Sequence, residues 1–125
     1  MIVGVGTDLV AIGRLRDMWQ RHGERALDRL LAHEERAACQ ASSDPGRFLA
    51  KRFAAKEALG KALGTGIRAP VLLTSIAVVH DALGKPTFRF VDGLAAWMEE
   101  RQWACHLSLS DEAEYAQAFV IVEKS

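Results

Sequence analysis

Residues 47–66 read RFLAKRFAAKEALGKALGTG, and this stretch carries the clearest helix signal of the chain. The periodic pattern starts at about Arg47 and ends at Leu63. A Ser-Ser-Asp-Pro-Gly turn cluster precedes it at residues 42–46, and Gly-Thr-Gly follows it at residues 64–66. The other predicted helices lie before and after this one in the sequence.

One narrow stripe of this helix has an unusual composition. At 100° per residue, small, acidic and basic side chains line up: Ala50, Ala54, Glu57 and Lys61. Small side chains would let a ligand or another subunit approach, with Glu57 holding a cation and Lys61 neutralising phosphate oxygens. Alternatively, Glu57 and Lys61 form an ordinary exposed ion pair, which stabilises a helix by about 0.2–0.5 kcal/mol. A second stripe holds Phe48, Arg52, Leu59 and Leu63.

The segments before this helix predict one strand and two helices. A strand is expected from residue 2 to about Asp8, and its glycines at positions 4 and 6 indicate close approach of another backbone. Helical periodicity covers residues 11–22 and then residues 24–41, with Gly23 between them.

The segments after it change to a strand-like period. Strands are expected over residues 75–80, 86–91, 103–110 and 115–123, with a helix that Asp92 caps before the last two. Helices first and strands mostly later predict an α+β fold, with the N-terminal helices packed on an antiparallel sheet. A length of 125 residues predicts a single domain over 1–125.

Charge is balanced over the chain but not within each half. Sixteen basic residues cancel sixteen acidic ones, which argues against a protein that mainly coats nucleic acid or an anionic membrane. Residues 1–68 nevertheless carry a net charge of +4, and residues 69–125 carry −4. No signal peptide or membrane span is predicted, so a cytoplasmic location is expected. Cys39 and Cys105 lie far apart and suit neither zinc nor dithiol chemistry.

Asp8 follows a glycine-rich segment that resembles a dinucleotide fingerprint only in part. Leu9 stands where the third glycine is needed, and the Asp8 carboxylate would repel a phosphate at the following helix. Because Mg²⁺ typically takes one or two carboxylates and completes its shell with water and phosphate, Asp8 is a candidate metal ligand. The alternative is that Asp8 caps the helix that begins near Ala11.

The first predicted helix carries a basic stripe around one methionine. If the helix continues in register past Gly23, the stripe contains Arg14, Met18, Arg21 and Arg25. Such a face suits an acidic partner protein, although a solvated face balanced by nearby acids has the same pattern.

Among four histidines, His106 is the best candidate for a functional role. Strand alternation places it on a polar face with Ser108 and Ser110. A structural histidine with a satisfied hydrogen bond is the alternative.

Three segments together resemble the holo-acyl-carrier-protein synthase family of bacterial phosphopantetheinyl transferases. They are GVGTDLV from residue 4, FLAKRFAAKEA from residue 48 with KALGTGI from residue 61, and HLSLS from residue 106 with the following Tyr115-Ala116. Gly84-Lys85-Pro86 adds a weaker match. The order, the spacing and the total length agree, so the resemblance covers essentially the whole chain.

The resemblance implies transfer of 4′-phosphopantetheine from coenzyme A to a serine of acyl carrier protein. It implies that Asp8 and Glu57 bind Mg²⁺ and that Lys61 contacts phosphate and assists proton transfer. It assigns coenzyme A binding to Arg52, Lys61, Gly64, Thr65 and His106, and carrier-protein binding to Arg14, Met18, Arg21 and Arg25. The family forms homotrimers with sites between subunits, so Asp8 with Glu57 and His106 are expected to come from different chains. The serine proton needs an acceptor, for which Glu57 is the first candidate.

Two positions depart from the pattern of many relatives, which carry glycine at Arg68 and histidine at Asp111. A rival hypothesis is a non-catalytic module that binds an acidic protein through Arg14, Met18 and Arg21. A coenzyme A-binding hydrolase or acyltransferase is a third, but the chain lacks a nucleophile elbow or a convincing nucleophile–histidine arrangement.

Overall fold

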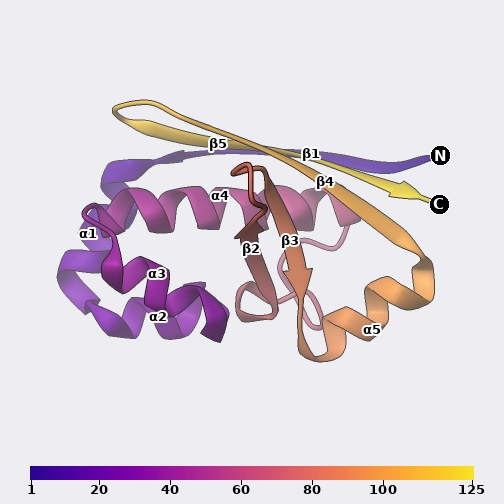
Figure 1. Ribbon diagram of the computed structural model, residues 1–125, viewed down its shortest axis with the longest axis horizontal. Helices are drawn as coiled ribbons and strands as arrows, with labels where there is room; N and C mark the ends of the chain where they lie inside the picture. Colours follow the sequence, from indigo (N-terminus) through magenta and orange to yellow (C-terminus); the bar gives the residue numbers. More distant parts are fainter.

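The computed structural model describes residues 1–125 and confirms an α+β fold. A three-stranded sheet covers one side of the long helix α4, and the smaller helices and a two-stranded hairpin lie on the other side (Figure 1). The elements in chain order are β1 (Ile2–Ala11), α1 (Ile12–His22), α2 (Glu24–Leu30), the 3-10 helix η1 (His33–Glu35), α3 (Arg36–Ala41), α4 (Pro45–Leu63), the 3-10 helix η2 (Leu73–Ser75), β2 (Ile76–His80), β3 (Pro86–Phe90), α5 (Asp92–Arg101), β4 (Trp103–Asp111) and β5 (Tyr115–Lys124).

Helix α4 begins and ends where its sequence carries cap signals. The Asp44 side chain accepts a hydrogen bond from the backbone N–H of Arg47, and Pro45 occupies the first turn, where its missing N–H costs nothing. Gly64 closes the helix in the left-handed conformation, with φ of 78°. The helix therefore starts two residues earlier than predicted and ends at the predicted residue.

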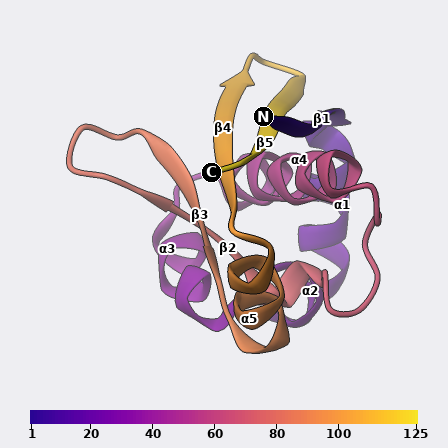
Figure 2. The same ribbon diagram turned by 90° about the vertical axis from the view of Figure 1, so that its right-hand side faces the viewer.

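The three-stranded sheet is antiparallel with strand order β1-β5-β4, and β2 and β3 form a separate hairpin. Figure 2 shows this hairpin projecting from the body of the molecule. The inner face of the sheet packs on α4, and 26 buried residues form one hydrophobic cluster. None of the helices is both long and apolar enough to cross a membrane.

The sheet and α4 approach each other at the level of the backbone. A Cβ added to Gly6 would lie 2.0 Å from the carbonyl oxygen of Ala58, and one on Gly4 would collide in the same way one turn later. The predicted close backbone approach is therefore confirmed. Ala50 and Ala54 are fully buried within the chain itself, so the expectation that they leave room for a ligand or another subunit is wrong.

Strand β1 is longer than predicted. It pairs with β5 residue by residue as far as Ala11, opposite Tyr115, and so continues past Asp8. Helix α1 starts only at Ile12, and no side chain caps its N-terminus. The alternative role of Asp8 as a helix cap is therefore excluded.

The prediction of a single helix over residues 24–41 is wrong, because the chain leaves the helical conformation at Leu31. Three short helices, α2, η1 and α3, replace it. The buried carboxylate of Glu35 accepts a hydrogen bond from the backbone N–H of Ala32 at 2.9 Å and so stabilises the break. Asp92 also differs from the prediction: it is the first residue of α5, has φ of 56°, and does not cap the helix through its side chain.

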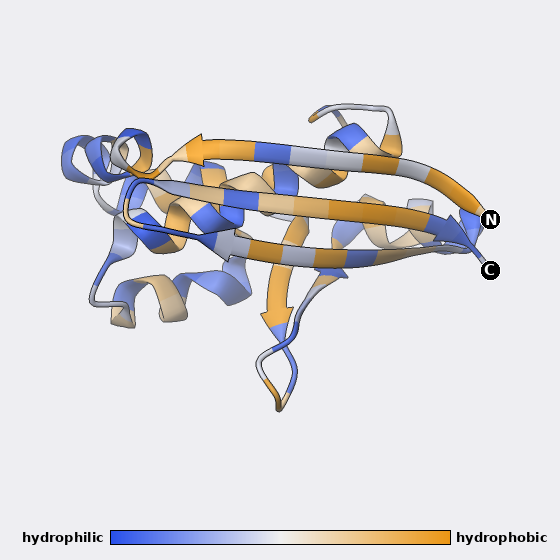
Figure 3. Ribbon diagram, turned by 90° about the horizontal axis from the view of Figure 1, so that it is seen from above, coloured by the Kyte–Doolittle hydropathy of each residue, from blue (hydrophilic) through white to orange (hydrophobic).

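The outer face of the sheet carries large apolar side chains in contact with solvent. Figure 3 views the molecule from this side. Val5 is 54% exposed, Leu9 62% and Phe119 43%. Soluble proteins seldom leave an apolar surface of this kind uncovered, so this face is a candidate contact with another protein chain.

Candidate active site

Asp8 and Lys61 meet where the edge strand β1 passes the last turns of α4. The Lys61 ammonium donates to Oδ1 of Asp8 at 3.0 Å and to the carbonyl oxygen of Thr7 at 2.9 Å. The Asp8 side chain is 17% exposed, whereas that of Lys61 is 55% exposed. Because Asp8 lies on the inner side of β1, between the buried positions Gly6 and Val10, its carboxylate faces the helix.

Glu57 lies one helical turn before Lys61 and makes no side-chain hydrogen bond or ion pair. Burial raises the pKa of Glu57, and the negative charge of Asp8 raises it further, while Lys61 and Arg14 act in the opposite direction. The two carboxylates are thus close enough to repel each other. The Asp8 carboxylate has one protein donor, Lys61, and the Glu57 carboxylate has none. Two neighbouring carboxylates with so few protein donors are typical of a functional site.

This donor set fits Mg²⁺ better than it fits a closed structural metal site. No group of three or more histidine, cysteine or acidic side chains is gathered anywhere in the chain. Mg²⁺ commonly binds through one or two carboxylates and keeps its other positions for water and substrate phosphate. Asp8 and Glu57 supply two carboxylates, and their mutual repulsion favours a cation between them.

Gly64 and Thr65 lie immediately beyond Lys61 at the end of α4. The backbone N–H of Gly64 donates to the Lys61 carbonyl at 3.1 Å, and the Thr65 hydroxyl donates to the carbonyl of Gly66 at 2.8 Å. The structure therefore brings Asp8 to Lys61 with Glu57 beside them, and Gly64 and Thr65 follow Lys61 by three and four residues at the end of α4.

Arg52 is not part of this group. It lies nine residues before Lys61, which places the two on opposite sides of α4 and about 14 Å apart along its axis. The Arg52 guanidinium is 2.9 Å from the Glu35 carboxylate and stacks on the ring of Phe48 at 4.3 Å.

Arg52 lines a cavity of about 470 Å³ together with two further basic residues, Arg47 and Lys51. These two also bind Asp111, at 2.8 Å and 3.5 Å, which lowers the pKa of that carboxyl group. Asp111, one of the two positions at which the sequence departs from many relatives, thus brings an acidic group to Arg47 and Lys51. Sequence reasoning missed Arg47 and Lys51, although two basic residues four apart on one helix are a recognisable signal.

His106 lies apart from both groups, on the outer face of β4. Its Nε2 is 2.7 Å from Oε1 of Glu123 on β5. Both side chains remain about half exposed, so the pair is accessible from outside the chain.

The proposed partner-binding residues do not form one continuous helical stripe. Gly23, with φ of 52°, ends α1, so Arg25 belongs to α2 and the expected register past Gly23 is wrong. Arg14 lies over the ring of Phe53 at 5.4 Å. Met18 and Arg25 nevertheless line the same groove, because α1 and α2 pack side by side.

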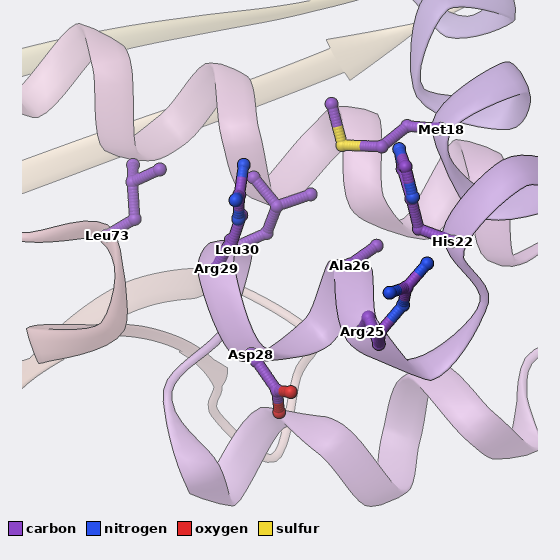
Figure 4. A pocket seen from close by; sticks show the side chains of 8 residues that line it. All are labelled: Met18, His22, Arg25, Ala26, Asp28, Arg29, Leu30 and Leu73. Carbon is purple, nitrogen blue, oxygen red and sulfur yellow. The ribbon is translucent and has the colours of Figure 1, made fainter.

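This groove, of about 570 Å³, is shown in Figure 4 and is called the α1–α2 groove below. Its lining residues are Met18, His22, Arg25, Ala26, Asp28, Arg29, Leu30 and Leu73. Leu73 stands at the end opposite Met18. Sequence reasoning missed Arg29, although it follows Arg25 by one helical turn.

Comparison with known proteins gives consistent results over nearly the whole chain. The model of the 4′-phosphopantetheinyl transferase superfamily matches residues 4–120. A holo-[acyl-carrier-protein] synthase of Azoarcus sp. (strain BH72) is 57% identical over 123 residues, which are 98% of each chain. The crystal structure of the corresponding synthase from Neisseria meningitidis is 44% identical with a TM-score of 0.94, covering 99% of this chain and 100% of that one. The Bacillus anthracis synthase, solved in complex with CoA (3′,5′-ADP), is 35% identical with a TM-score of 0.84, covering 100% and 99%.

Proposed function

The chain belongs to the holo-[acyl-carrier-protein] synthases of the 4′-phosphopantetheinyl transferase superfamily, and we propose that residues 1–125 form one domain that converts apo acyl carrier protein to its holo form. The reaction moves 4′-phosphopantetheine from coenzyme A to a serine of the carrier protein and releases adenosine 3′,5′-bisphosphate. The observation that carries this proposal is the contact of Asp8 with Lys61 beside the unpartnered Glu57. Membership in this family disfavours the non-catalytic module.

Lys61 and the two carboxylates have separate tasks in this proposal. The serine oxygen forms a bond to the phosphorus that carries pantetheine, and the bond from that phosphorus to the bridging pyrophosphate oxygen breaks. Lys61, half exposed and already held toward Asp8, neutralises charge on the phosphate oxygens. Asp8 and Glu57 would hold Mg²⁺, which when bound supplies further charge neutralisation at the pyrophosphate.

Glu57 is the first candidate to accept the serine proton. It has no side-chain partner, and its raised pKa makes it a better proton acceptor than an ordinary exposed glutamate. Binding to Mg²⁺ would weaken it as a base, so a water held by Glu57 is the alternative route for the same proton. In the first case Glu57 accepts the proton itself, and in the second it orients the water that accepts it.

The positions of the residues assigned to coenzyme A support sites that are shared between subunits. Arg52 and Lys61 lie on opposite sides of α4, and His106 lies on the outer face of the sheet. The 3′-phosphate and the pyrophosphate of coenzyme A are attached to the same ribose, and the separation of Lys61 from Arg52 on α4 therefore favours binding of one molecule by two neighbouring chains. We assign Lys61 to the pyrophosphate and the cavity of Arg47, Lys51 and Arg52 to the 3′-phosphate end, contributed by a neighbouring chain.

The exposed apolar face of β1 and β5 is the surface proposed for assembly. Its side chains Val5, Leu9 and Phe119 would be removed from water in a homotrimer. Light scattering should then give a mass three times the 13.7 kDa of the chain. A monomer at assay concentration would contradict the shared site.

The α1–α2 groove and its basic rim are the proposed docking surface for acyl carrier protein. Arg14, Arg21 and Arg25 would meet acidic side chains, and Met18 would supply an adaptable apolar contact. Arg14→Glu should raise the KM for carrier protein about fivefold, much more than it raises the KM for coenzyme A. Arg89→Glu on β3 is the matched control, and equal effects on both substrates would refute the docking surface.

Mass spectrometry of apo carrier protein provides the decisive test. Incubation with the protein, coenzyme A and Mg²⁺ should add the mass of phosphopantetheine, and a carrier whose acceptor serine is replaced by alanine should gain nothing. Removal of Mg²⁺ by a chelator should stop the gain. A well-folded protein that adds no mass would overturn the proposed function. The cytoplasmic location belongs to the same proposal, and fractionation of the producing cells tests it.

A further inference from the structure

Lys56 is a fully buried lysine for which the proposed reaction has no use. Its side chain is 0% exposed, and its ammonium donates to three oxygens. Two of these are backbone carbonyls, of Leu30 at the end of α2 and of Leu73 in η2, at 2.8 Å and 2.9 Å. The third is Oε1 of Glu35. One side chain of α4 thus joins the segment that holds Leu30 and Glu35 to Leu73, which lies 38 positions after Glu35 in the sequence.

The two carbonyls belong to residues that line the α1–α2 groove. Leu30 is the last residue of α2, and Leu73 is the one lining residue from outside α1 and α2. Figure 4 shows both side chains with the rest of the lining. Lys56 thus connects the backbone of Leu30 to that of Leu73, one on each side of the groove.

Glu35 makes this bridge possible. Its carboxylate is buried and also accepts hydrogen bonds from the backbone N–H groups of Ala32 and Val78, while Arg52 lies against it. These contacts hold the carboxylate in one position. A buried ammonium is stable only when an opposite charge and hydrogen-bond acceptors surround it, and Glu35 supplies both.

We propose that Lys56 is a positioning residue that sets the width of the α1–α2 groove for the carrier protein, with Glu35 as its fixed counter-ion. This inference rests on the proposed function, because it assigns the groove to the carrier protein. It adds that affinity for that partner depends on a side chain that the partner never touches. Lys56 acts through Leu30 and Leu73, whose positions it holds.

Lys56→Met tests the proposal, because methionine keeps the apolar stem and removes all three donors. The KM for apo carrier protein should rise about tenfold, while the KM for coenzyme A stays within about twofold of wild type. A merely structural role would lower the fraction of active enzyme and hence kcat, and would leave both KM values unchanged. That second result overturns the proposal. Glu34→Gln is the matched control, since Glu34 is the exposed neighbour of Glu35 and should behave like wild type.

Leu73→Ala is the second variant, for use if circular dichroism shows that Lys56→Met does not fold. It trims one side of the groove without touching Lys56 and should also raise the KM for carrier protein alone; an unchanged KM refutes the proposal. Calorimetric titration with apo carrier protein separates the two hypotheses, since it needs no transfer. If wild type binds the carrier without modifying it, and Lys56→Met binds about tenfold more weakly, the groove assignment stands and the proposed function fails.

Discussion

Lys56 and Glu57 are neighbours in the sequence, yet they belong to charged clusters of opposite character. Lys56 is fully buried, and three oxygens satisfy its ammonium. Glu57 is partly exposed, has no side-chain partner and faces a second carboxylate. The first cluster, Glu35 with Arg52 and Lys56, joins elements together. In the second, Asp8 accepts a hydrogen bond from Lys61, and the oxygens of Glu57 have no protein donor.

Helix geometry explains how adjacent residues reach such different surroundings. Successive side chains on a helix point 100° apart, so Lys56 faces α2 and η2 while Glu57 faces the edge strand β1. Burial lowers the pKa of Lys56 to about 8, although Glu35 opposes the shift, and burial raises the pKa of Glu57. The Lys56 ammonium, with its three acceptors, contributes to the fold. The Glu57 carboxylate, which has no donor, lowers stability and is available for chemistry.

The largest expected effect is the loss of transfer in Asp8→Ala and in Glu57→Ala. Each removes one of the two carboxylates proposed to hold Mg²⁺, so the rate should fall by about a thousandfold or more. Both variants should keep the circular dichroism spectrum and melting temperature of a folded protein. Transfer at the wild-type rate in either one would refute the metal assignment.

Removing Glu35, the counter-ion of the buried Lys56, should destabilise the fold at the cluster of Glu35, Arg52 and Lys56. Glu35→Ala leaves a buried ammonium without its partner and should lower the free energy of unfolding by about 3–5 kcal/mol. Urea denaturation measures the change. Glu34→Ala, one residue earlier and exposed, should cost less than about 0.5 kcal/mol. A cost for Glu35→Ala as small as that of the control would show that the buried cluster is not structural.

A smaller effect is expected where β1 positions Asp8. A Cβ at Gly6 would lie 2.0 Å from the Ala58 carbonyl, so Gly6→Ala must push β1 away from α4, at a cost of about 1–3 kcal/mol. Asp8 lies two residues later on the same strand, so transfer should slow as well. Gly13→Ala is the control, because nothing lies within 4 Å of its added Cβ. Unchanged transfer and stability in Gly6→Ala would contradict this account of the site.

The smallest expected effect is electrostatic. Asp8→Asn removes a charge that raises the pKa of Glu57, so that pKa should fall, and NMR titration of the Glu57 carboxyl can follow it. Because folding raises this pKa above the unfolded value, Glu57 contributes stability at low pH that is lost as pH rises through its folded pKa. In Asp8→Asn this loss should diminish. A pKa that does not move would place the two carboxylates too far apart to share a cation.

The sequence predicted helix α4, its terminal glycine and the strand that carries Asp8, because caps, periodicity and glycine spacing are local signals. The comparisons confirm the resemblance to the holo-acyl-carrier-protein synthase family. Local signals failed at residues 24–41, where helical periodicity continues across a break that a distant lysine and a buried carboxylate stabilise. Lys56 itself was missed, although it follows Arg52 by one helical turn.

The sequence alone determined which residues this protein offers for chemistry, since Asp8, Glu57 and Lys61 stand in recognisable local patterns. Only the tertiary structure decided which of them meet. It brought Asp8 to Lys61 across 53 positions of the chain, while Arg52 was turned to the opposite side of the same helix and His106 to the far face of the sheet. The reason is physical: helical and strand periods specify the face on which a side chain lies, but packing specifies what that face meets.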